Sequence, residues 1–80
     1  MSKKTYFVAQ GFEVSDKGRI KALPAQEMQS AAQADRMARS FAVSKGGGLA
    51  FSRDGDPTTG DYDDAVVIGR YGHVPEEQSL

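Results

Sequence analysis

One stretch of sequence decides the fold: residues 30–46, which read SAAQADRMARSFAVSKG. Its first four residues fit a capping box, in which the serine and glutamine side chains each accept a hydrogen bond from a free amide near the start of a helix. Apolar residues then recur at the spacing of one helical face, at positions 31, 34, 37, 38, 41 and 42. Lys45 complements the dipole of a helix C-terminus, and Gly46 suits a left-handed cap. The stretch therefore predicts one helix over residues 31–45.

The segment before this helix predicts a β-hairpin. Residues 5–14 are rich in aromatic and β-branched side chains, which favour a strand. Residues 15–18, SDKG, supply turn chemistry, because the glycine adopts a positive φ without strain. Residues 19–23 then alternate between charged and apolar side chains, and Pro24 cannot donate a hydrogen bond to a neighbouring strand. We therefore expect a second strand that ends at Pro24 or lies at a sheet edge.

The segment after the helix predicts a second hairpin. Residues 48–52 and 62–71 read as strands, the latter because it contains the apolar run AVVI. The glycine run 46–48 has two interpretations. Glycines cradle a phosphate when they precede a helix, whereas these follow one. We therefore predict a flexible connection between helix and strand rather than a phosphate site.

The order of these elements predicts an α+β fold of ββαββ type, in which two β-hairpins are joined by one helix. The hairpins form a single four-stranded sheet with the helix on one face. The 80 residues suffice for one domain, which we place at residues 1–74, and we expect residues 75–80 to form a disordered acidic tail. The chain has no cysteine, so neither disulfides nor thiolate metal sites stabilise its small core.

One helix is too narrow to cover this sheet. A helix covers about 10 Å and four strands span roughly 19 Å, while the first and fourth strands carry apolar residues on both faces. We expect a second copy of the chain to supply the missing cover, through the helix-free face or by pairing of strand edges. The alternative is a twisted sheet whose second face tolerates small apolar groups. The residues expected on the dimer face are Tyr6, Val8, Phe12, Ala65, Val67 and Tyr71.

The net charge of -1 hides an uneven distribution. Residues 1–53 hold nine Lys or Arg and four acids, a balance of +5, whereas residues 54–80 hold one Arg and seven acids, a balance of -6. Either a basic surface lies opposite an acidic one, or only a turn and a tail are acidic. The basic hairpin also suggests an alternative function, weak nucleic-acid binding, with contacts from Lys17, Arg19 and Lys21 and with bases stacked on aromatic rings.

Five aspartates fall within residues 54–64. Their spacing fails the helix-loop-helix calcium pattern, because a threonine stands at that loop's glycine position and an alanine at its glutamate position. A weak cation loop built from Asp54, Asp56 and Asp61 stays open as a second interpretation. The sequence DPTTG at 56–60 favours an ordinary hairpin turn, with its final glycine in the left-handed conformation.

The sequence offers little material for catalysis. His73 is the only histidine, no cysteine can act as a nucleophile, and adjacent aspartates on a strand point to opposite faces. We therefore expect no enzyme activity, no catalytic residues, no cofactor and no metal. Two lysines before an apolar run resemble the start of a signal peptide, but the run stops at Gln10 and no window is long enough to cross a bilayer. We expect a cytoplasmic protein without membrane contact.

Most of the chain resembles a group of short, uncharacterised bacterial proteins of about this length. The resemblance rests on FSRDGDPTTGDYDDA at 51–65, ADRMA at 34–38 and YGHVP at 71–75. It implies a bacterial cytosolic protein and assigns no activity, cofactor or partner. The sequence therefore predicts a homodimeric interaction module without catalysis, and it does not identify any other protein partner.

Overall fold

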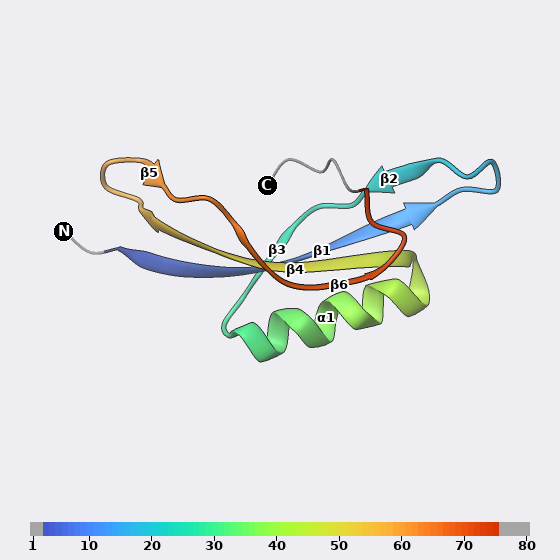
Figure 1. Ribbon diagram of the computed structural model, residues 1–80, viewed down its shortest axis with the longest axis horizontal. Coiled ribbons are helices and arrows are strands. Elements are labelled where there is room, and N and C mark those ends of the chain that lie inside the picture. Colours follow the sequence, from blue (N-terminus) through green and yellow to red (C-terminus); the bar gives the residue numbers. More distant parts are fainter. Residues whose placement is uncertain (1–2, 76–80) are drawn as a thin grey trace.

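The computed structural model describes residues 3–75 and shows an α+β fold with one helix and a curled antiparallel sheet (Figure 1). Its elements are β1 (Lys4–Val14), β2 (Ile20–Ala22), β3 (Gln26–Met28), α1 (Ala31–Ser44), β4 (Gly46–Asp56), β5 (Asp61–Tyr62) and β6 (Val66–Gly72). Of the predicted tail at 75–80, all but Pro75 lies outside the described residues. Within residues 3–75, no helix combines the length and apolar character needed to cross a membrane.

Two long strands, β1 and β4, form the centre of the sheet. They run antiparallel over ten residue pairs, from Lys4 opposite Gly55 to Glu13 opposite Gly46. The outer edge of β1 carries β2 and β3, and the outer edge of β4 carries β5 and β6. The six strands therefore occupy four positions, which agrees in part with the predicted ββαββ layout. The difference is that the outer strand of each hairpin is broken in two.

The break between β2 and β3 lies at Pro24, which has no amide hydrogen to give to the sheet. Beside it, the amide of Leu23 donates to the carbonyl oxygen of Gly11 at 2.9 Å, and Nε2 of Gln10 donates to the carbonyl oxygen of Leu23 at 3.0 Å. The Gln10 side chain thus provides a hydrogen bond at the sheet edge, where the regular backbone pairing of the strands stops. The predicted edge position is confirmed, whereas β3 was not predicted because its sequence, QEM, has no strand-like pattern.

Helix α1 begins as the capping box predicts. The side chain of Ser30 accepts a hydrogen bond from the amide of Gln33 at 3.1 Å. The Gln33 side chain accepts from the amide of Gln29 at 2.9 Å, one residue before the expected donor. At the other end, the amide of Lys45 donates to the carbonyl oxygen of Phe41 at 2.7 Å. The predicted helix is confirmed to within one residue at its C-terminus.

The glycine run 46–48 is part of strand β4 and lies between two packed segments. A Cβ atom at Gly48 would lie 1.8 Å from the carbonyl oxygen of Ala38 in the helix. A Cβ atom at Gly47 would lie 2.0 Å from the carbonyl oxygen of His73. The prediction of a flexible connection is therefore wrong, because these glycines allow backbone to approach backbone on both faces of the sheet.

The apolar core has two parts, one on each face of the sheet. On the helix side, Ala34, Ala38 and Ala50 are fully buried. On the helix-free side, Phe12 and Leu49 are fully buried and Phe51 nearly so, with Val8, Ala65 and Val74 packed against them. The chain therefore covers part of its own second face, with residues that flank β6. Figure 1 shows β2 and β5 on the side of the sheet away from α1.

A β-bulge in β6 changes which side chains face the helix. Phe51 lies opposite Val67, but the neighbouring Ala50 lies opposite Gly69, so Ile68 is an extra residue. The extra residue reverses the alternation for the remainder of β6. Tyr71 consequently packs with Ala34, Ala38 and Ala50 on the helix side. Its predicted place on the helix-free face is wrong, because a strict alternation of faces does not anticipate a bulge.

Candidate functional site

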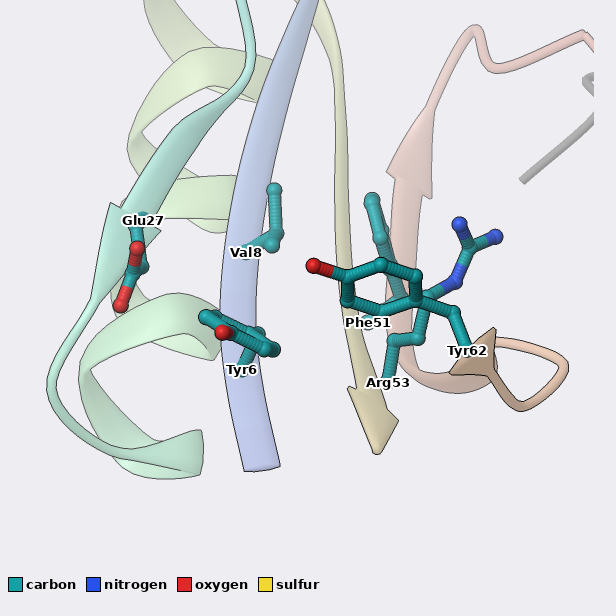
Figure 2. Close-up of a pocket in the computed structure, with 6 residues that line it drawn as sticks. All are labelled: Tyr6, Val8, Glu27, Phe51, Arg53 and Tyr62. Carbon is teal, nitrogen blue, oxygen red and sulfur yellow. The ribbon is translucent and has the colours of Figure 1, made fainter. Parts of the chain in front are cut away.

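A small open cavity of about 300 Å³ lies on the helix-free face, near the start of β1 (Figure 2). We call it the tyrosine slot. Its lining residues come from four strands and are Tyr6, Val8, Glu27, Phe51, Arg53 and Tyr62.

The register of the sheet brings these residues together. Tyr6 lies opposite Arg53, and Val8 lies opposite Phe51 on one side and Glu27 on the other. Residues two apart on a strand share a face, so all five point away from the helix. Figure 2 shows Glu27 on one side of β1 and Arg53 on the other, with Tyr6 and Val8 between them.

Tyr62 closes the slot from β5. It lies opposite Gly55, where a Cβ atom would lie 2.0 Å from the Tyr62 ring. The absent side chain lets the ring fold over β4, and Figure 2 shows its hydroxyl directed toward β1. The rings of Tyr6 and Tyr62 are tilted by 50°, with centroids 6.1 Å apart, which is within the range of a favourable aromatic contact.

Two cations border the slot. Nζ of Lys4 lies 4.9 Å from the centroid of the Tyr6 ring and 3.7 Å from the carboxylate of Glu27. Burial, and next the proximity of Tyr62, raises the pKa of the Tyr6 hydroxyl above its ordinary value. Nε of Arg53 is buried, and it has no hydrogen-bond partner among the described residues. An unpaired buried donor costs about 1–3 kcal/mol.

The predicted dimer-face residues divide into three groups. Tyr6 and Val8 line the slot. Phe12 is fully buried beneath the same face, and Ala65 packs against the apolar cluster that contains Phe12. Val67, which lies opposite Phe51, remains 45% exposed. Tyr71 lies on the helix side. The slot residues that the sequence did not reveal are Glu27, Phe51, Arg53 and Tyr62.

Tyr71 instead ties the helix to the sheet. Its hydroxyl donates a hydrogen bond to Oδ1 of Asp35, and Nε of Arg39 lies 3.2 Å from Oδ2 of the same carboxylate. The guanidinium of Arg39 also lies 5.2 Å from the centroid of the Tyr71 ring. A Cβ atom at Gly69 would lie 2.5 Å from Asp35 Oδ1, so glycine leaves the room for this arrangement. The three side chains form a structural clamp.

The basic hairpin and the exposed aromatic rings lie apart. Lys17, Arg19 and Lys21 are exposed at the β1–β2 end, and Lys21 lies opposite Glu13. Tyr6 is seven residues from Glu13 along β1, about 23 Å at the usual strand rise. Two other aromatic rings of β1, those of Phe7 and Phe12, pack in the core. The structure does not bring the proposed nucleic-acid contacts into one surface.

The aspartate-rich segment forms the predicted hairpin turn. Oδ1 of Asp56 accepts a hydrogen bond from the amide of Thr58 at 2.9 Å, and its carbonyl oxygen accepts from the amide of Gly60 at 2.8 Å. Gly60 has the expected positive φ, 79°. Asp54 accepts from the hydroxyl of Thr5 at 2.6 Å. Asp61 is exposed, and residues 3–75 contain no group of three His, Asp or Glu side chains placed to hold a metal ion.

Comparisons with known proteins identified no relative of this chain. No protein-family model, curated protein or solved structure matches the chain. The resemblance to short bacterial proteins therefore stays a prediction.

Proposed function

We propose that the protein is a self-associating interaction module, which forms a homodimer through its helix-free face and has no catalytic activity. The observation that carries the proposal is the tyrosine slot, an open cavity lined by the rings of Tyr6, Phe51 and Tyr62 together with Arg53. Buried aromatic and arginine side chains are the usual anchors of protein interfaces.

The size of a stable interface supports a contact broader than the slot. A specific interface buries about 800 Å² on each partner, roughly one seventh of the 5398 Å² that this chain exposes. Six residues do not supply that area, so neighbouring apolar groups must contribute. Val67, 45% exposed beside Phe51 on the same face, is the nearest such group along β6. We therefore place the interface over the slot and the adjoining part of β6.

Packing through the face is better supported than pairing of strand edges. The β2–β3 edge is interrupted at Pro24, and its two strands have three residues each. The β6 edge is longer but contains the bulge at Ile68. Short strands, prolines and bulges all hinder the addition of another strand.

Weak nucleic-acid binding is the less supported alternative, because the basic hairpin lies about 23 Å along β1 from the Tyr6 ring. A cytoplasmic location is part of our proposal.

Light scattering coupled to gel filtration tests the dimer at tens of micromolar protein. We expect the mass of two chains for the native protein and a shift toward one chain for Val67→Asp, which places a charge on the interface. Val43→Asp is the matched control, because Val43 is 90% exposed on the helix, and its mass should equal that of the native protein. A native mass of one chain would refute the proposed function.

A further inference from the structure

The charges on either side of the tyrosine slot suggest how two copies meet. Arg53 belongs to β4, and its Nε is buried without a partner in the described part of the chain. Glu27 belongs to β3, on the far side of β1, and its side chain is 57% exposed. One acid and one base thus flank an apolar centre formed by Tyr6 and Val8.

Among the described residues, these two groups do not form an ion pair with each other. Strands lie about 4.8 Å apart, so β3 and β4, which both neighbour β1, are separated by roughly 10 Å. Glu27 instead makes a long contact with Lys4, 3.7 Å between Nζ and Oε2, and both side chains stay more than half exposed. Each member of the pair therefore keeps capacity for a partner outside its own chain.

We propose that the dimer is isologous, with its two-fold axis passing over β1 between Tyr6 and Val8, so that Arg53 of each copy pairs with Glu27 of the other. This inference rests on the proposed homodimer and specifies its geometry. In an isologous contact, residue i meets j and j meets i, so one axis creates both ion pairs. The Tyr6 and Val8 side chains of the two copies then pack against each other at the centre.

Charge complementarity favours a second copy over other occupants. An acidic ligand would satisfy Arg53 but would be repelled by Glu27, and a basic ligand would have the opposite difficulty. A second copy presents both signs in the required places.

Charge reversal tests this arrangement. Glu27→Arg should weaken self-association at least about tenfold, because the Arg53 of each copy would then face the new arginine of the other copy. Arg53→Glu should weaken it similarly. Glu13→Arg is the matched control, because Glu13 is exposed at the other end of β1 on the helix side, and its dissociation constant should stay within about twofold of the native value.

Mixing the two reversed chains gives the sharpest outcome. The pairs across such a contact are Arg with Glu in both positions, so a heterodimer should form with near-native affinity although each chain alone associates weakly. Sedimentation velocity with one chain fluorescently labelled measures this. If circular dichroism shows that Arg53→Glu does not fold, Arg53→Ala replaces it and should still prefer the Glu27→Arg chain.

The outcomes separate the two proposals. A native dimer that is unaffected by Glu27→Arg, or reversed chains that do not recover on mixing, would overturn this axis while leaving the homodimer in place. A native protein that is monomeric at tens of micromolar would remove both.

Discussion

Replacing Gly48 with alanine tests how closely helix α1 lies on the sheet. The new Cβ atom would lie 1.8 Å from the carbonyl oxygen of Ala38 and 2.6 Å from its carbonyl carbon, whereas ordinary contacts begin at 3.4 Å. Both neighbours are backbone atoms, so no rotation of a side chain relieves the clash. The helix would have to withdraw by roughly 1.5 Å, in a core whose close packing tolerates little displacement.

The cost follows from what that withdrawal disturbs. It would separate Ala34 and Ala38 from Ala50, all three of which are fully buried. Overpacking costs about 1–3 kcal/mol, and the backbone clash places this substitution at the upper end, about 3 kcal/mol. A domain of this length has a stability of about 4–12 kcal/mol, so a quarter or more would be lost. The melting temperature should fall by about 12–24 °C.

Urea unfolding followed by circular dichroism measures the change, provided that the slope with denaturant stays the same. Gly60→Ala is the control. Gly60 has a positive φ but no atom within 4 Å of the added Cβ, so it should lose only the backbone preference, about 1–2 kcal/mol. If Gly48→Ala proves no more destabilising than Gly60→Ala, the close approach of helix and strand is not as described.

Three further predictions concern single side chains. Tyr71→Phe removes the hydrogen bond to Asp35 and should lower the free energy of unfolding by about 1–2 kcal/mol, whereas in an Asp35→Ala background the same change should cost little. Ser30→Ala removes the helix cap and should cost about 1 kcal/mol by urea unfolding; a loss below a few tenths would contradict the cap. Tyr6 should release its proton above the ordinary pH of about 10 when tyrosinate absorbance is followed in the folded protein. The unfolded chain releases that proton at a lower pH than the folded protein does. The stability that the protonated Tyr6 hydroxyl contributes is therefore present below about pH 10 and is lost as pH rises through the folded pKa. Tyr6→Phe should remove this loss.

The parts of the fold that depend on near neighbours were readable from the sequence. The helix and both glycine turns were found because caps and turns use residues within four positions of each other. The length of β4 was missed, since three glycines are poor strand formers and only the distant contacts of Gly47 and Gly48 explain them.

The candidate site was harder to predict for the same reason. Tyr6 and Val8 lie on the helix-free face, where the sequence places them, because alternation along β1 is regular. Arg53 and Glu27 were missed because the predicted third strand stopped at residue 52 and β3 was not expected at all. Tyr71 was misplaced because the bulge at Ile68 depends on pairing with β4, which the local sequence does not specify.

The pairing of β1 with β4 also has a consequence for how the chain folds. The partners in this central ladder are separated by 33 residues between Glu13 and Gly46 and by 51 residues between Lys4 and Gly55. Contacts so distant along the chain slow folding, because a large loop must close before any ladder pair forms. Helix α1 lies inside that loop, and its 14 residues span about 21 Å as a helix but about 46 Å when extended. An early helix therefore shortens the search between the two strands, and changes in its stability should alter the folding rate more than the unfolding rate.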